Sequence, residues 1–328
     1  MSYNFACLLL ALLSLAGCSS RPATDHAAAA SNDKSPSTAA TGAADAVPFE
    51  DRCAAPGVFK CISFDRDSDF VTSGGPPTQT VYPNSQNSFA NVNKDCSIAV
   101  SGCSIRFTVP AIPEAGANMA GKYEYDFIRE GKEFGQNSTF YVQVRIRFDQ
   151  ALLANKYGGE GWKFVLIYGG KTSCSNIGLI NQNTWYYGFP TMAHECSPGV
   201  YTISGSTQYV EQGDYNCVYG KFNNKDCAYF KPNQWMTFYW KVHLGTWGQP
   251  DSSVESWVSY ENAPLKKWIS QPKFTFKFQE GPRDVFDKVA LTPYTTDRKE
   301  AASSDGQMWF DDLIVSSQPI PAPYGPTP

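Results

Sequence analysis

The feature that most limits the fold of this chain is the stretch FYVQVRIRF at residues 140–148, in which two kinds of side chain alternate without a break. One set is apolar and consists of Phe140, Val142, Val144, Ile146 and Phe148. The other set consists of Tyr141, Gln143, Arg145 and Arg147. Successive side chains of a β-strand point to opposite faces, so the stretch is predicted to be a strand with one face in a core.

Similar stretches recur along the chain, separated by turn-rich clusters such as YGGEG and GTWGQPDS. They occupy residues 123–128, 162–169, 235–245, 252–260, 273–279, 287–294 and 308–316. Helical periodicity is scarce, and only residues 151–158 are predicted to form a short helix. Many short strands with few helices predict an all-β domain, built as an antiparallel β-sandwich or a barrel.

Three stretches carry a resemblance to a known fold: PNQWMTFYWKVHLGTWG, VESWVSY and GQMWFDDLIVS. They resemble the C-terminal half of the concanavalin A-like lectin/glucanase jelly roll, and the resemblance extends over residues 120–317. It implies an antiparallel β-sandwich, one of whose sheets bends into a concave groove that holds a glycan. Members of this superfamily include glucanases, lectins and polysaccharide lyases that act on alginate, glucuronan and heparin, so the fold alone selects no activity.

The outward side chains of these strands suit an acidic polysaccharide. Arg pairs with a carboxylate through two parallel hydrogen bonds, and Tyr and Trp stack on the apolar faces of sugar rings. The predicted substrate-binding residues are Gln143, Arg145, Arg147, Lys241, Trp257 and Asn183. The alternative for each strand is an ordinary solvated face on the convex side of the sandwich.

Such a face favours β-elimination of a uronate-containing glycan. Neutralising the uronate carboxylate eases removal of the neighbouring proton, which a base takes while an acid protonates the leaving oxygen. The lyases of the resembled fold carry Arg and Gln or Asn with a His and a Tyr in the groove. The candidates here are His194 or His243 for the base and Tyr294 or Tyr141 for the acid. Either histidine can also be structural, His194 in a disulfide loop and His243 on a strand surface.

Hydrolysis is the competing chemistry, and it needs two carboxylates that face each other across the scissile bond. Glucanases of this fold carry E-x-D-x-x-E on one strand, whereas this chain offers only Glu124 and Asp126. The sequence therefore predicts a polysaccharide lyase. The alternatives are a non-catalytic glycan-binding surface lipoprotein, a glycoside hydrolase, and a structural surface protein without a sugar ligand.

The N-terminus resembles a bacterial lipoprotein signal. An apolar run from Phe5 to Ala16 is too short to span a bilayer comfortably and is followed by Gly17 and Cys18. The resemblance implies that residues 1–17 are a signal peptide, that Cys18 carries lipid chains such as palmitate, and that the protein is anchored in the outer membrane. An ordinary secretory signal is the alternative.

The rest of the chain divides by composition. Residues 18–47 are rich in Ala, Ser, Thr and Asp and predict a disordered tether behind the lipidated cysteine. Residues 48–317 are predicted to form the jelly-roll domain, and residues 318–328 a Pro-rich tail.

Cysteine content agrees with export. Of ten cysteines, Cys7 lies in the signal and Cys18 at the lipid site, which leaves eight for the domain. These are predicted to form disulfides, most simply in four sequential pairs: Cys53, Cys61, Cys96, Cys103, Cys174, Cys196, Cys217 and Cys227. Zinc is disfavoured, because the chain has no C-x-x-C pair.

The formal net charge of −4 gives no reason to expect a nucleic acid partner. We expect a monomer that binds a polysaccharide and is held to the membrane by its lipid. The sequence predicts no metal site or cofactor, although calcium is possible because Asp311 and Asp312 can ligate a cation.

Overall fold

The structure is a computed structural model that describes residues 46–70, 79–82, 91–109, 111, 122–154, 162–169, 176–181, 190–195, 201–203, 209–210, 228–276, 285–295 and 304–328. All of them belong to one compact unit, Ala43–Pro328. Within these ranges, every helix falls short of the length and apolar character needed to traverse a lipid bilayer.

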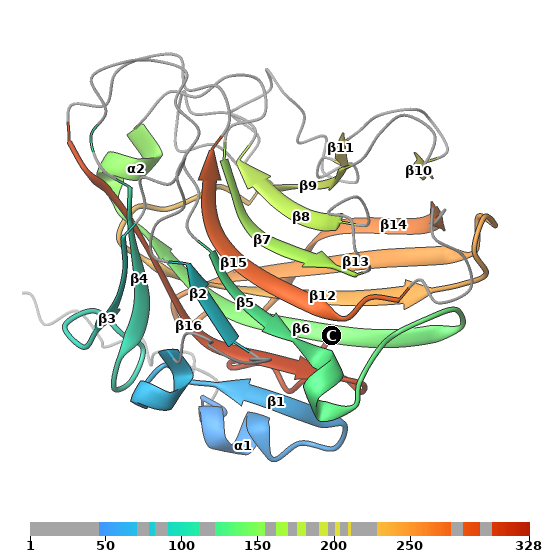
Figure 1. Ribbon diagram of the computed structural model, residues 1–328, viewed down its shortest axis with the longest axis horizontal. Coiled ribbons are helices and arrows are strands. Elements are labelled where there is room, and N and C mark those ends of the chain that lie inside the picture. Colours follow the sequence, from blue (N-terminus) through green and yellow to red (C-terminus); the bar gives the residue numbers. More distant parts are fainter. Residues whose placement is uncertain are drawn as a thin grey trace, which may run out of the picture. The chain divides into compact units, whose positions relative to one another are not determined.

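The described residues form two antiparallel sheets, which confirms the predicted antiparallel sandwich (Figure 1). Sheet A runs in the order β10-β14-β13-β12-β6-β16-β4-β3, with β1 also paired to β16. Its strands are β1 (Val58–Ile62), β3 (Asn91–Asp95), β4 (Ser104–Val109), β6 (Ser138–Phe148), β10 (Tyr201–Ile203), β12 (Trp235–Leu244), β13 (Ser252–Tyr260), β14 (Lys266–Phe276) and β16 (Gly306–Ser316).

Sheet B runs in the order β11-β9-β8-β7-β15-β5-β2. Its strands are β2 (Gln79–Tyr82), β5 (Lys122–Asp126), β7 (Trp162–Tyr168), β8 (Asn176–Asn181), β9 (Pro190–Glu195), β11 (Tyr209–Val210) and β15 (Lys288–Thr295).

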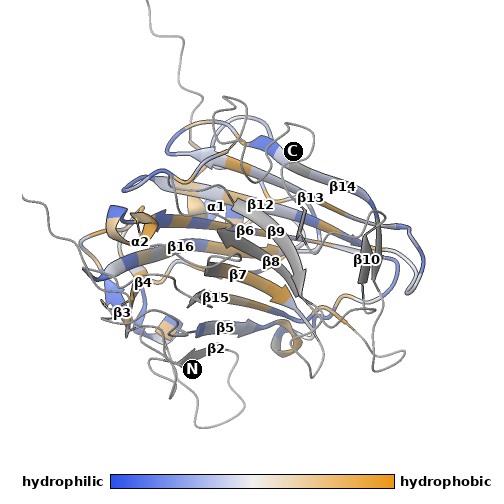
Figure 2. Cartoon of the chain, turned by 90° about the horizontal axis from the view of Figure 1, so that it is seen from above, coloured by the Kyte–Doolittle hydropathy of each residue, from blue (hydrophilic) through white to orange (hydrophobic). Residues whose placement is uncertain are grey.

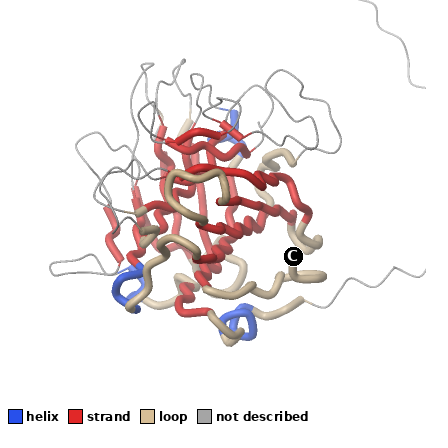
Figure 3. The backbone as a smooth tube through the Cα atoms, turned by 90° about the vertical axis from the view of Figure 1, so that its right-hand side faces the viewer, coloured by secondary structure: helices blue, strands red, loops and turns tan. Residues whose placement is uncertain are grey.

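Helices are short and lie at the margins of the sheets (Figure 3). They are α1 (Phe49–Cys53), α2 (Gln150–Ala154) and the 3-10 helices η1 (Asp67–Phe70) and η2 (Phe127–Glu130). The helix predicted at 151–158 corresponds to α2, which begins one residue earlier and ends at Ala154, where the described range also ends.

The core lies between the two sheets and is rich in aromatic rings. The apolar residues of β6, from Phe140 to Phe148, are all fully buried there, as the alternation predicts. The ring centroid of Phe148 lies 5.4 Å from that of Phe164 in sheet B, with the rings edge to face. Burying a side chain of this size stabilises a fold by roughly 1.5–3 kcal/mol, so this strand is a major source of cohesion between the layers.

The outer face of sheet A is covered by both ends of the domain. Along the strands of this sheet, hydrophilic and hydrophobic residues both occur (Figure 2). A second apolar cluster forms on the face opposite the core and contains Tyr141, Tyr239, Trp257, Ile314 and Ile320, with Phe49 packed against it. Phe49 comes from α1, and Ile320 comes from the residues that follow β16, which we call the C-terminal segment (residues 317–328).

The C-terminal segment crosses several strands of sheet A. Its backbone amide at Ile320 donates to the hydroxyl of Tyr239 at 3.1 Å. Its carbonyl at Pro323 accepts from the amide of Val47 at 2.9 Å. Ile320 and Ala322 are almost completely buried. The segment predicted as a tail beyond residue 317 is therefore packed on the domain.

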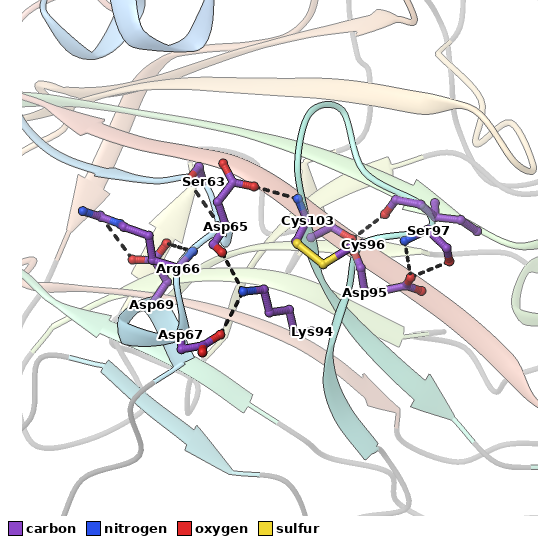
Figure 4. The surroundings of a disulfide bond; sticks show 12 residues. Ser63, Asp65, Arg66, Asp67, Asp69, Lys94, Asp95, Cys96, Ser97 and Cys103 are labelled. Carbon is purple, nitrogen blue, oxygen red and sulfur yellow. Dashed lines mark hydrogen bonds and ion pairs between the residues drawn. A yellow bond between two sulfur atoms is a disulfide. The ribbon is translucent and has the colours of Figure 1, made fainter.

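Two disulfides lie in the described ranges, Cys53–Cys61 and Cys96–Cys103, and both are the sequential pairs that were predicted. The second joins residues beside the facing ends of β3 and β4, where the Cys103 amide donates to Asp65 at 2.6 Å (Figure 4). The remaining predicted disulfide cysteines, Cys174, Cys196, Cys217 and Cys227, lie outside the described residues.

Candidate functional site

The polar residues of β6 share one face of sheet A with polar residues of β12, as the alternation predicts. Gln143 is paired in register with Tyr239, Arg145 with Thr237, and Tyr141 with Lys241. All of these residues lie on the side of sheet A that faces away from sheet B.

This part of the face is closed rather than open. Gln143 has no exposed surface, and its amide donates to the carbonyl of Pro321 at 3.2 Å while its carbonyl oxygen accepts from the guanidinium of Arg52. Arg145 is 5% exposed and Tyr141 is 9% exposed. The expectation that these three residues line an open groove is corrected, because α1 and the C-terminal segment lie over them.

Arg52 belongs to a buried network of charges below α1. Its second guanidinium nitrogen contacts Asp312 Oδ2 at 2.5 Å. Asp312 has a positive φ of 51° at an irregularity in the pairing of β16 with β6. Asp311 accepts from the amides of Val100 and Asp312, both at 2.8 Å.

Burial and the neighbouring charge of Asp312 raise the pKa of Asp311 to about 8. Burial also raises the pKa of Asp312, although Arg52 opposes that change. The guanidinium of Arg52 occupies the position that a cation beside Asp312 would need, and no group of three metal-ligating side chains occurs among the described residues.

Another part of the same face is more open and carries Lys241 and His243. Trp257 beside them is only 8% exposed and belongs to the covered apolar cluster, so the expectation that its ring is open to a sugar is corrected as well. Lys241 contacts Glu255 at 3.1 Å, and Lys267 contacts the other oxygen of that carboxylate. The ammonium of Lys267 lies 4.9 Å from the ring centroid of Trp257. Burial alone would raise the pKa of Glu255, but the hydrogen bonds from the two lysines lower it below its ordinary value.

His243 lies on the same outer face, at the C-terminal end of β12. Its Nδ1 is 3.0 Å from the hydroxyl of Thr139 on β6. Arg147 lies at the opposite end, with its guanidinium 6.0 Å from the ring centroid of Trp309. The predicted residues on sheet A are thus spread along a face whose central part is covered.

The other predicted catalytic residues lie on the other sheet. His194 is on β9, paired in register with Ile177, and Tyr294 is on β15, paired with Lys163. Asn183 lies outside the described residues. The structure therefore does not bring His194 and Tyr294 together with Gln143 and Arg145, because the core separates sheet A from sheet B.

Sheet B has a polar outer face of its own. The sequence pattern pointed to Glu124 on this face but not to Lys122, Tyr168 or Lys288. Lys122 and Glu124 on β5 contact each other at 2.5 Å. The ammonium of Lys122 also donates to the hydroxyl of Tyr168 on β7 at 3.2 Å. Lys288 on β15 lies 5.9 Å from the ring centroid of Tyr168 and contacts Asp287 at 3.0 Å. We call Lys122, Glu124, Tyr168 and Lys288 the tyrosine cluster.

Three strands position the tyrosine cluster through their register. Lys288 is paired with Asp126 on one side and with Tyr168 on the other. Ala290 is paired with Glu124, and it is fully buried although its neighbours Val289 and Leu291 take the core side. A small residue here leaves room for the long side chains of β5 and β7 to meet above β15.

The tyrosine cluster holds two ammonium groups and one carboxylate, and Asp287 lies beside it in contact with Lys288. Burial raises the pKa of Asp287, whereas the hydrogen bond from Lys288 and its positive charge act to lower it. Asp126, one of the two carboxylates considered for hydrolysis, accepts from the amide of Ile128 at 3.0 Å and so caps η2. The sequence did not predict Tyr168 as a site residue, because this tyrosine ends the apolar run WKFVLIY, in which apolar and polar side chains do not alternate.

Comparisons with known proteins support the fold. No protein-family model matches the sequence, and the search of curated proteins gave no match. The endo-beta-1,4-glucuronan lyase from the fungus Trichoderma reesei has a TM-score of 0.50 at 9% sequence identity, covering 77% of this chain and 96% of that chain. The marine PL-14 alginate lyase from Aplysia kurodai has a TM-score of 0.47 at 13% identity, covering 68% of this chain and 86% of that chain. At 9% identity the likeness to the glucuronan lyase shows the fold alone, a β-sandwich.

Proposed function

We propose that this protein is a polysaccharide lyase that cleaves an acidic glycan by β-elimination at the outer face of sheet B. The observation that carries the proposal is the tyrosine cluster, in which one phenol lies beside two ammonium groups on adjoining strands. The similarity in fold to a glucuronan lyase agrees with this function but does not by itself establish it.

Three groups of the tyrosine cluster have a role in the proposed reaction. Lys122 and Lys288 attract the uronate carboxylate, whose neutralisation eases removal of the proton on the neighbouring carbon. Tyr168 accepts a hydrogen bond from Lys122, so its own proton is free to pass to the leaving glycosidic oxygen. The carbon–oxygen bond breaks as the proton is lost, and a carbon–carbon double bond forms in the product.

The base remains a prediction from the sequence. His194 stays the candidate on this sheet because it belongs to β9, and Tyr294, predicted as an acid, lies on β15 of the same sheet. Lipidation of Cys18 and an outer-membrane location also stay predictions, since residues 1–45 lie outside the described ranges.

The direct test is to incubate the purified protein with alginate, glucuronan and heparin and to follow the ultraviolet absorbance of the unsaturated product. The variant Tyr168→Phe removes only the hydroxyl and should lower kcat by about 100-fold or more, as loss of general acid catalysis does. Unfolding curves should coincide, because that hydroxyl lies on an outer face.

A matched substitution on the opposite face distinguishes the two sheets. If Tyr141→Phe abolished product formation and Tyr168→Phe did not, the reaction would belong to sheet A. Absence of product from every uronate polymer would remove the lyase proposal. Binding on a glycan array without product would favour the alternative of a non-catalytic glycan-binding protein.

A further inference from the structure

Buried polar atoms without a hydrogen-bond partner gather on the outer face of sheet A. Around Arg145 they are Arg52 Nε, Arg145 Nε, Arg147 Nε, Thr237 Oγ1, Ser259 Oγ and Asp312 Oδ1. All of these atoms can donate except Asp312 Oδ1, which is an acceptor, and a buried donor or acceptor left unpaired costs about 1–3 kcal/mol. Several such atoms in one place indicate a group that the protein chain itself does not supply.

Arg145 is the centre of this arrangement. It is 5% exposed, and its Nε is buried without a hydrogen-bond partner among the described residues. Its register partners are Asp311 on β16 and Thr237 on β12, and Thr237 is in turn paired with Ser259 on β13. Thr237 and Ser259 are 1% and 2% exposed.

Arg145 shares the carboxylate of Asp312 with Arg52, because the positive charges of both side chains act to lower the pKa of that carboxyl. Arg52 is committed to Asp312 and Gln143. Both oxygens of Asp311 accept backbone amides. A buried arginine that shares one carboxylate with a second arginine has its desolvation penalty only partly compensated, and a bound anion would offset part of the rest.

The site has a floor and a cover. Sheet A forms the floor, since the strands that carry Arg145, Thr237 and Ser259 are direct neighbours. The cover is the C-terminal segment, which is held by the contacts of Pro321 with Gln143 and of Pro323 with Val47. Its Gly325 lies so close to Pro264, beyond the end of β13, that an added Cβ would be 2.9 Å from Cβ of that proline.

We propose that a small anion with carboxylate-like oxygens binds at Arg145 beneath the C-terminal segment, with Thr237 and Ser259 as hydroxyl donors. The planar guanidinium presents a fork of N–H groups that matches two oxygens of one carboxylate. The site is separate from the tyrosine cluster, because the two lie on opposite sheets. It therefore does not depend on the proposed lyase activity.

The test is titration calorimetry with acetate as the probe, repeated with sulfate and chloride. Wild-type protein should bind acetate in a saturable way, and Arg145→Met should abolish that binding. The control is Arg66→Gln, which alters an arginine whose side chain is 71% exposed and should leave the affinity unchanged. Equal heats for wild type and Arg145→Met, or no binding of any of the three anions, would overturn the proposal.

A second variant serves if Arg145→Met does not fold. Thr237→Val has nearly the same shape and lacks only the unpaired hydroxyl, so it should fold and bind acetate about tenfold more weakly, the equivalent of one lost hydrogen bond. An unchanged affinity in Thr237→Val, with Arg145→Met unable to fold, would also overturn the proposal.

Discussion

Arg52 is a single side chain that links three parts of the chain far apart in sequence. It lies in α1, and its guanidinium contacts Gln143, 91 residues away, and Asp312, 260 residues away. The alternation along β6 correctly predicts that Gln143 and Arg145 share a face. It carries no information on what covers that face, because the cover comes from both ends of the domain.

Replacing Arg52 tests whether this contact stabilises the fold. Arg52→Ala would leave Asp312 buried without its partner, so the free energy of unfolding should fall by about 3–5 kcal/mol. Urea denaturation measures the change. The control Arg66→Ala removes an ion pair to Asp69 from an exposed arginine and should cost about 0–1 kcal/mol. Equal losses in the free energy of unfolding would show that the buried ion pair stabilises the fold no more than the exposed ion pair does.

Asp311 makes stability depend on pH. Its pKa in the folded protein is raised to about 8 from the ordinary value of 3.8, so the folded state holds the proton more tightly than the unfolded state. The resulting stability is present in full below pH 3.8 and is lost as pH rises toward about 8.

Thermal unfolding at a series of pH values from 5 to about 9 tests this dependence. In Asp311→Asn the decline in melting temperature across that window should be shallower than in wild type, because the titrating group is gone. Parallel curves for the two proteins would mean that Asp311 is already ionised at the lower pH.

At the scale of elements, α1 is too short to hold itself in place. It has five residues and no side-chain hydrogen bond at its N-cap, and isolated helices of that length are unstable in water. Two features fix it: the disulfide from its last residue, Cys53, to Cys61 in β1, and the contacts of Arg52. This disulfide could be expected from the short spacing of its cysteines, whereas a partner for Arg52 could not.

Removing the Cys53–Cys61 bond should loosen α1 and with it the cover over Gln143. For a bridge spanning 8 residues, the chain-entropy model gives a loss of roughly 2–3 kcal/mol. The double variant Cys53→Ser/Cys61→Ser should melt at a lower temperature than wild type. Its hydrogen exchange should rise at residues 47–53 and 317–323, and the matched variant Cys96→Ser/Cys103→Ser should raise exchange around β3 and β4 instead. Unchanged exchange in α1 would show that the Arg52 contacts suffice.

At the scale of the whole molecule, the sandwich has two outer faces with different characters. The face of sheet A is covered at its centre by the domain's own ends, and the face of sheet B carries the tyrosine cluster. Strand periodicity shows which residues lie together on one strand face. It does not show which strands join the same sheet, since pairs such as β6 with β16 form between residues more than 150 positions apart. This is why His194, one of the two predicted bases, lies on a different layer from Gln143 and Arg145.

The hydrogen bond between Val47 and Pro323 places the two ends of the described chain next to each other. Coupling the domain to a bead or a sensor chip through residue 47 or through the C-terminal segment should therefore attach it by the same side. In that orientation the tyrosine cluster would point toward the surrounding solution, so an immobilised preparation should still give long polymers unhindered access to it.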